Sequence, residues 1–76
     1  MDNIFLIHAN HEITRLNKGI SKKDVQQIFG SALHFIDKKK ESNEDIWLCW
    51  FGITQRSKLY KLLFRDDMLE WAMRLG

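Results

Sequence analysis

The chain has 76 residues, of which 45% are hydrophobic and 29% are charged, and its formal net charge is +2. So short a chain supports one hydrophobic core, which predicts a single domain over residues 1–76. The composition excludes a disordered chain, and the small positive charge permits contact with phosphate without requiring it. A lone cysteine, Cys49, excludes an internal disulfide, and no cysteine–histidine spacing resembles a zinc site, so we expect no metal and no other cofactor.

The longest apolar runs, which include Ile4–Ile7 and Ile46–Ile53, are far shorter than the roughly 18 residues needed to cross a bilayer. The amino terminus has no basic segment followed by an apolar signal core. These patterns predict a cytoplasmic protein with no membrane partner. The run Ile4–Ile7 itself fits either a short edge strand or an extended arm.

A first helix is expected over residues 11–18. Asn10 is a suitable N-cap, and Gly19 provides the left-handed geometry in which helices commonly end. Ile13 and Leu16 lie at helical spacing and form the apolar stripe of this segment. The pattern therefore predicts one short amphipathic helix.

A second helix is expected over residues 21–30. Ser21 followed by Asp24 resembles a capping box, and Gly30 closes the segment. The apolar stripe of this helix consists of Val25, Ile28 and Phe29. Because such a stripe needs a partner to bury it, we expect it to pack across a sheet.

Three strands are expected next, because aromatic and branched residues are concentrated there between polar stretches that suit hairpin loops. They are Leu33–Asp37, Ile46–Thr54 and Lys58–Arg65. The middle strand is apolar on both faces, which places it at the centre of an antiparallel meander. In the last strand, alternation puts Tyr60, Leu62 and Phe64 on one face and Leu59, Lys61, Leu63 and Arg65 on the other.

The last segment carries a further capping pattern, Asp67 followed by Glu70, and an apolar stripe of Met68, Ala72 and Leu75. This pattern predicts a C-terminal helix. The expected fold is therefore of the α+β class, with two N-terminal helices packed on a three-stranded antiparallel sheet, followed by a C-terminal helix.

The residue types offer few candidates for acid/base or nucleophilic chemistry. Three histidines are acid/base candidates, because imidazole is the side chain generally suited to proton transfer near neutral pH; they are His8, His11 and His34. An ordinary surface or strand position is the more common role for His11 and His34. Cys49 has apolar neighbours and is typical of a buried hydrophobe rather than a nucleophile. Helix capping explains two of the three carboxylates in the cluster Asp66, Asp67 and Glu70.

The cations form a stronger pattern. Lys61 and Arg65 share one face of the last strand, where they can present a positive groove to a phosphate backbone. Aromatic residues that would stack on unpaired bases are Trp47, Trp50 and Tyr60. The competing interpretation is that such cations are solvated loop or edge residues and that such aromatic residues belong to the core.

The run HEITRLNKGIS (residues 11–21), continued through Asp24 and Val25, resembles the opening of BrnT-like bacterial toxins and of a neighbouring uncharacterised family. The segments WLCWFGIT and KLYKLLFR are similar to strands of the same proteins, so the likeness covers most of residues 8–65. It implies a RelE-like fold, cleavage of RNA without a metal, and a cognate antitoxin that masks the active surface. The chain has DDMLE (residues 66–70) where BrnT-like proteins continue into an arginine-rich segment.

The resemblance thus predicts a small RelE/BrnT-like toxin of a toxin–antitoxin system. His11 is then the acid/base candidate, and the cations that hold the phosphate are Arg15, Lys61 and Arg65. The expected partners are RNA and a cognate antitoxin protein. The alternative is a non-catalytic protein- or nucleic-acid-binding module, including a homodimer anchored by the last helix and exposed tryptophans.

Overall fold

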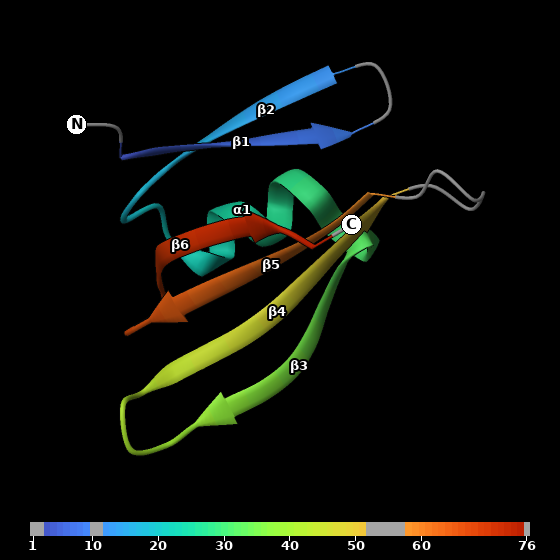
Figure 1. The fold of residues 1–76 in the computed structure, drawn as a ribbon. Coiled ribbons are helices and arrows are strands. Elements are labelled where there is room, and N and C mark those ends of the chain that lie inside the picture. The colour runs from blue at the N-terminus through green and yellow to red at the C-terminus, as the bar shows by residue number, and fades with distance from the viewer. Residues whose placement is uncertain (1–2, 10–11, 52–57, 76) are drawn as a thin grey trace.

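The structure, a computed structural model, describes residues 3–9, 12–51 and 58–75. Two strands form an antiparallel hairpin, and four more form an antiparallel sheet in the order of the sequence. A single α-helix and a short 3-10 turn lie between them along the described chain (Figure 1). The elements are β1 (Ile4–Ala9), β2 (Glu12–Asn17), α1 (Lys22–Phe29), η1 (Gly30–Ala32), β3 (Leu33–Lys39), β4 (Glu44–Phe51), β5 (Lys58–Arg65) and β6 (Met68–Arg74).

Helix α1 confirms the predicted second helix. The Asp24 backbone N–H donates to the Ser21 hydroxyl at 3.1 Å, and Gly30 follows the last helical residue with a φ of 56°. Val25 is fully buried, whereas Ile28 is 49% exposed, so the buried stripe is narrower than predicted. No helix among the described residues is long and apolar enough to span a membrane.

Strands β3, β4 and β5 correspond to the three predicted strands. β4 lies between β3 and β5, which confirms its central position, although it begins at Glu44 rather than Ile46. The predicted end of this strand, residues 52–54, lies outside the described residues. The alternation predicted for β5 is confirmed by the burial of Tyr60, Leu62 and Phe64.

The predicted first helix is wrong, because residues 12–17 form strand β2. β1 pairs with this strand in antiparallel register, with Leu6 opposite Arg15, so the first apolar run is a strand rather than an arm. In a strand, residues three apart point to opposite faces. Accordingly Leu16 is completely buried while Ile13 is 58% exposed, and the helical spacing of the two residues does not correspond to a shared face.

The predicted C-terminal helix is also wrong, because residues 68–74 form strand β6. Asp66 and Asp67 have φ angles of 53° and 62° and form the two-residue turn that joins Arg65 to Met68. Both central residues of such a hairpin turn need positive φ, which aspartate tolerates better than most residues. The apparent capping pattern is therefore a turn, the sheet has four strands rather than three, and the fold is mostly β.

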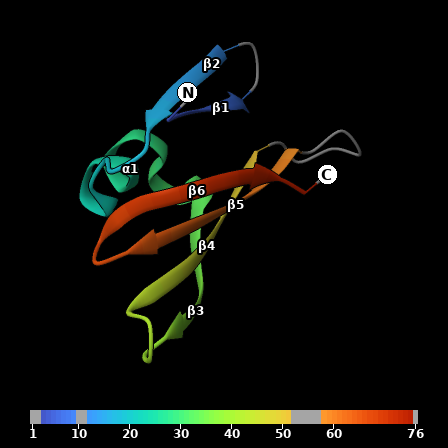
Figure 2. The same ribbon diagram turned by 60° about the vertical axis from the view of Figure 1, so that its left-hand side comes forward.

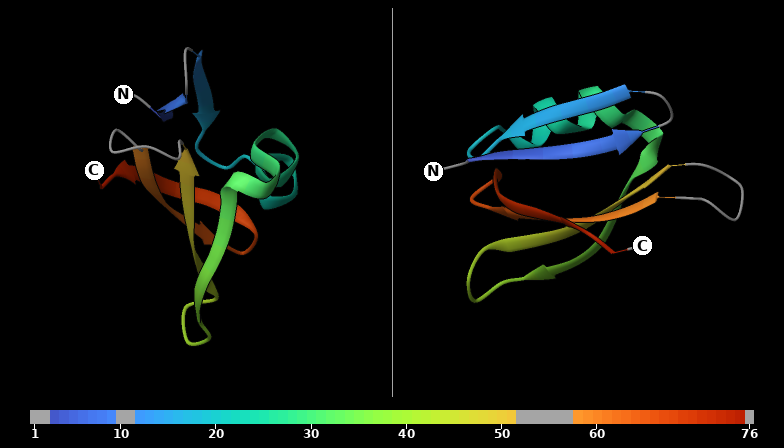
Figure 3. Two further views of the ribbon diagram at one scale, coloured as in Figure 1. Left: turned by 90° about the vertical axis from the view of Figure 1, so that its right-hand side faces the viewer. Right: turned by 45° about the horizontal axis from the view of Figure 1, so that its top comes forward.

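The core lies between the hairpin, α1 and one face of the four-stranded sheet. We call this face the inner face and the opposite one the outer face. Figures 2 and 3 show α1 against one side of the sheet and the hairpin beside the edge formed by β6. The buried residues of the core are Ile7, Leu16, Val25, Leu33, Cys49, Tyr60, Leu62, Phe64 and Leu69.

A short backbone connection ties the hairpin and α1 to the start of β6. The Gly19 N–H donates to the Leu69 carbonyl at 2.7 Å, and the Leu69 N–H donates to the Ile20 carbonyl at 2.8 Å. The Lys22 N–H donates to the Asp67 carbonyl at 2.8 Å. We call residues 19–22 the connector, because these bonds hold the end of the hairpin and the first turn of the helix on one strand.

The side chain of Lys22 also binds two carboxylates. Its ammonium group lies 2.8 Å from a carboxylate oxygen of Asp45, which is only 7% exposed, and 2.8 Å from one of Asp67. The hydrogen bonds to Asp45 and then to Asp67 raise the pKa of Lys22. A buried carboxylate is costly unless it is paired, so Lys22 satisfies the one buried charge recorded among the described residues.

We predict that Lys22→Met destabilises the protein, because the Asp45 carboxylate then loses its ionic partner inside the fold. The expected loss is about 1–3 kcal/mol, the cost of leaving a buried polar group unsatisfied. Urea unfolding followed by circular dichroism measures it. Lys23→Met, at the exposed neighbouring position of the same helix, is the matched control. Equal unfolding midpoints for the two variants would contradict the assigned role of Lys22.

Candidate functional site

The outer face of the sheet holds two of the four residues predicted to act on RNA. Lys61 and Arg65 lie on β5 with their side chains opposite to the buried face of that strand, as predicted. The register places Lys61 across from Leu48 of β4, and Arg65 across from Glu44. The two cations therefore share a surface, but one of them faces a carboxylate.

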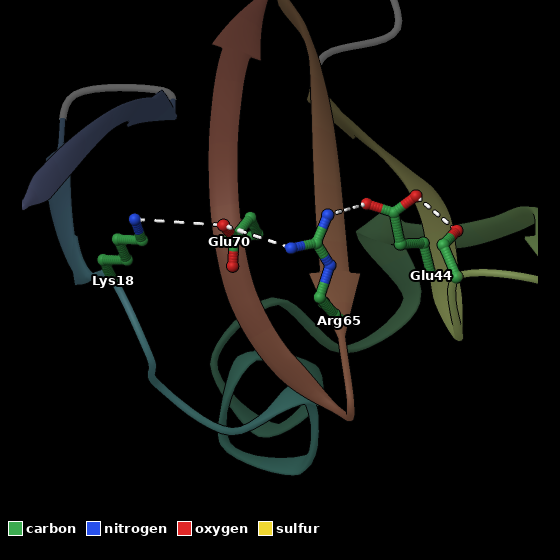
Figure 4. Close-up of polar contacts among 5 residues, drawn as sticks. Lys18, Glu44, Arg65 and Glu70 are labelled. Atoms are coloured by element: carbon green, nitrogen blue, oxygen red, sulfur yellow. Dashed lines mark hydrogen bonds and ion pairs between the residues drawn. The ribbon is translucent and has the colours of Figure 1, made fainter.

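Arg65 is held by carboxylates on both sides. One guanidinium nitrogen donates to Glu44 at 2.7 Å, and another lies 3.9 Å from Glu70, which is also 3.9 Å from the ammonium of Lys18. Figure 4 shows this row of alternating charges running across the strands. Hydrogen bonds from the Ser42 hydroxyl and from Arg65 lower the pKa of Glu44, and Glu44 in turn raises the pKa of Arg65. Arg65 was predicted to bind phosphate, but carboxylates of the protein itself already compensate its positive charge.

Lys61 lies over an aromatic ring. Its ammonium group is 5.8 Å from the ring centroid of Trp71 on β6. This distance is within the range of a cation–π interaction. Lys61 is partly buried, and no ion pair is recorded for it among the described residues. Of the predicted cations on this face, Lys61 is therefore the one not held by a carboxylate.

The other two predicted residues are not brought to this face by any recorded contact. Arg15 lies on β2, exposed, on the surface of the hairpin that points away from the core. No hydrogen bond or ion pair within residues 3–9, 12–51 and 58–75 joins Arg15 to Lys61 or Arg65. His11 lies outside the described residues. Among the three of these residues that the structure describes, Lys61 and Arg65 share a face and Arg15 lies on another element.

Apolar side chains make up about half of the outer face. Leu63 is only 7% exposed although no described element covers it, because side chains of its own sheet surround it. Trp50 is 56% exposed. By the register of the strands, the apolar residues of this face are Ile46, Leu48 and Trp50 on β4, Leu59 and Leu63 on β5, and Trp71 and Met73 on β6.

The charges of the outer face nearly balance. The cations placed on it by register or ion pairing are Lys18, Lys39, Lys61 and Arg65, and the carboxylates are Asp37, Glu44 and Glu70. A face built for a phosphate backbone shows a larger excess of positive charge. The chemistry of this face, as far as its residues are described, is therefore that of an apolar surface crossed by internal ion pairs.

The remaining reactive groups of the described residues make structural contacts or lie at the surface. No group of three metal-ligating side chains is found among these residues. The His8 N–H donates to the Tyr60 hydroxyl at 3.0 Å, which is a structural contact, and His34 is exposed on β3. Asp66 accepts a hydrogen bond from the side chain of Asn43 and serves to join two turns.

Sequence analysis missed the carboxylates that bind Arg65. Glu44 stood within a polar stretch that was assigned to a loop, and Glu70 was assigned to a helix cap. Glu44 comes just before the apolar pattern of β4, and antiparallel pairing of β4 with β5 places it opposite Arg65. This position was the sign in the sequence that the two side chains could meet. That signal depends on the register of β4 and β5, which the sequence did not define.

No protein-family model, no curated protein and no solved structure matches this chain. The resemblance to BrnT-like toxins consequently stays a prediction from short motifs.

Cys49 is fully buried in the core, as its apolar neighbours predict. Burial raises the pKa of its thiol to about 12. A thiol with that pKa is almost entirely protonated near neutral pH, and the thiolate is the reactive form. This environment does not support a role as nucleophile.

We predict that Cys49 in the folded protein resists alkylation by iodoacetamide at pH 8. The rate should be at least about 1,000-fold lower than in urea, because both the thiolate population and access to the sulfur are reduced. Mass spectrometry at successive times measures the rate. Reaction of the folded protein at the rate of the unfolded chain would show that the thiol is neither buried nor protonated as the fold requires.

Proposed function

We propose that this protein is a non-catalytic interaction module, and that it associates with a second copy of itself through the outer face of the sheet. The observation that carries the proposal is the uncovered apolar outer face, on which Trp50 is more than half exposed. Contiguous exposed apolar surface of this kind is typical of protein interaction sites. The pairing of Arg65 with Glu44 argues against a face dedicated to phosphate.

Charge and size favour a second copy as the partner. A two-fold interface places the same surface on both sides, so a face whose cations and carboxylates nearly balance meets its copy with little net repulsion. Four strands about 4.8 Å apart and about seven residues long at ~3.3 Å per residue give a footprint of roughly 20 by 23 Å. Side chains make the accessible area larger than this footprint, which brings it toward the ~800 Å² that each partner contributes to a standard interface.

We predict that Trp50→Ala weakens self-association by roughly 30-fold or more, because removal of an exposed aromatic anchor from an interface costs about 2 kcal/mol. Sedimentation equilibrium over a range of concentrations gives the dimer dissociation constant. Ile13→Ala removes an apolar side chain of similar exposure from the hairpin, 58% against 56%, and should leave the constant unchanged. A wild-type protein that stays monomeric at millimolar concentration would rule out this function.

The second candidate function is the RNA-cleaving toxin implied by the resemblance. It is favoured by the stacking of Lys61 on Trp71, because a cation beside an aromatic ring on an open sheet is a common platform for single-stranded nucleic acid. In this proposal Lys61 and Arg65 hold the RNA, His11 serves as the acid/base group, and a cognate antitoxin covers the outer face. Binding by Arg65 would require that Glu44 release it.

We predict for this second candidate that a labelled single-stranded RNA binds with an affinity that falls steeply as salt rises. Lys61→Ala should lower the slope of the logarithmic salt dependence by about one, and Lys23→Ala should not. Fluorescence anisotropy measures binding. Cleavage is detected as growth arrest and loss of intact transcripts after induction in a bacterium. His11→Ala should abolish both effects. Absence of salt-dependent binding together with intact transcripts would exclude the toxin.

A further inference from the structure

Strand β2 is an edge strand with one unpaired side. Among the described strands it pairs with β1 alone, in a register that runs without a bulge from Glu12 to Asn17. Figures 1 and 3 show β2 on the rim of the molecule, with β1 along one side of it. We call the side of β2 that faces away from β1 the open edge. Unpaired backbone groups on such an edge are a template for pairing with another chain.

The hydrogen bonds of the hairpin determine which backbone groups lie on the open edge. The Lys18 N–H donates to the Asn3 carbonyl, so even-numbered residues in this part of the chain face β1. Since successive residues of a strand face opposite neighbours, the N–H and carbonyl groups of Ile13 and Arg15 face away from β1. No partner is recorded for these groups within the part of the chain that the structure describes. Two residues of β2 thus present a free donor and a free acceptor each.

The side chains along the open edge are accessible as well. Ile13 and Arg15 lie on the surface of the hairpin that points away from the core, and Ile13 is 58% exposed. Glu12, at the start of the strand, is also exposed. Within residues 3–9, 12–51 and 58–75, no ion pair is recorded for Glu12 or Arg15. The open edge therefore offers a neighbouring strand one apolar side chain and two unpaired charges of opposite sign.

The hairpin that carries the open edge is held in place by the core. Ile7 and Leu16, on its other surface, are 1% and 0% exposed, and the Gly19 N–H donates to the Leu69 carbonyl just after β2 ends. A strand that is already fixed in its extended form loses little conformational freedom when another strand joins it. Two-stranded sheets also gain stability from a third strand. The open edge is therefore a preorganised site for strand addition.

The edge of the four-stranded sheet at β3 shows how this chain blocks strand addition elsewhere. β3 carries a bulge at Ile36, and residues 38–40, at its end, are all lysines. Bulges and lysines are devices by which proteins protect edge strands from pairing with other chains. β2 has a regular register and contains neither lysine nor proline. Its two charges differ in sign, so they select a partner of complementary charge rather than repel every strand.

We propose that the open edge of β2 binds an extended segment of a partner protein as a third strand of the hairpin, antiparallel to β2. Antiparallel pairing is the more stable arrangement per residue, and backbone hydrogen bonds to Ile13 and Arg15 supply the affinity. Opposite charges on directly opposed residues stabilise paired strands. The segment therefore carries a carboxylate across from Arg15, an apolar residue across from Ile13 and a cation across from Glu12. Read along the segment, the order is acidic, any residue, apolar, basic.

Charge complementarity favours a different protein over a second copy of β2. Directly opposed residues of two paired strands lie on the same face of the sheet. Glu12 and Arg15 are three residues apart in a strand, so their side chains lie on opposite faces. Antiparallel pairing of two copies of β2 through their open edges therefore never places Glu12 across from Arg15. A segment of another sequence can satisfy both charges at once.

The test uses random eight-residue peptides displayed on phage and selected on the whole purified protein, with the enriched peptides then synthesised. The expected peptides share the acidic, any, apolar, basic order. They should slow the hydrogen exchange of the Ile13 and Arg15 amides by about 10-fold or more, as measured by ¹⁵N NMR. In the free protein these two amides should exchange faster than those of Thr14 and Leu16, which face β1.

Two variants separate the backbone contribution from the charge contribution. Ile13→Pro removes an N–H of the open edge without removing a hydrogen bond to β1, and should weaken peptide binding about 10-fold relative to Ile13→Ala, which keeps the N–H. Arg15→Glu should also weaken binding about 10-fold, because it opposes like charges, and a peptide with lysine in place of its acidic residue should restore it. Lys23→Glu makes the same change of net charge at an exposed position of α1 and should bind the original peptides like the wild type.

Absence of enriched peptides, peptides that protect other amides, or unchanged binding by Arg15→Glu would each overturn the proposal. Slow exchange of the Ile13 and Arg15 amides in the free protein would overturn it too. Protection of these amides that rises with protein concentration would assign the open edge to a second copy instead. Trp50→Ala should leave peptide binding unchanged, so the outcome is independent of association through the outer face.

Discussion

The hydrogen bonds between the connector and the start of β6 are the constraint on which the rest of the structure depends. They fix the end of the hairpin and the first turn of α1 on the same strand, through Gly19, Leu69 and Lys22. Lys22 extends this junction into the sheet by binding Asp45 at 2.8 Å. With these points fixed, the apolar sides of the hairpin and the helix can only lie on the inner face. The core follows from that placement.

This arrangement covers the sheet on one face and leaves surfaces open elsewhere. One helix of eight residues and one hairpin bury most of the inner face, although Phe35 on that face stays 51% exposed, and no described residues remain to cover the outer one. The proposed binding surface is therefore a consequence of the fold, because a short chain packs a small hairpin over its core and leaves the opposite face of the sheet uncovered.

The candidate site was predictable from the sequence only in part. Alternation along β5 correctly placed Lys61 and Arg65 on one face, because a strand that buries every second residue leaves the others on the opposite side. The partners of Arg65 were not predictable. Glu44 and Glu70 reach it from neighbouring strands whose register depends on turn geometry and on a bulge in β6. The sequence therefore indicated a cationic groove, whereas the tertiary structure shows a row of ion pairs within the protein.

The sequence by itself determined the elements whose signals are local. Ser21 and Gly30 delimit α1 through a cap and a positive φ, and the alternation of Tyr60, Leu62 and Phe64 defines β5. Only the tertiary structure decided between helix and strand for residues 12–17 and 68–74, since segments this short contain too few apolar residues to distinguish the two patterns. β1 and β5 offered each of these segments an edge with which to pair, and the backbone hydrogen bonds of those pairs outweighed the weak helical preference of six or seven residues.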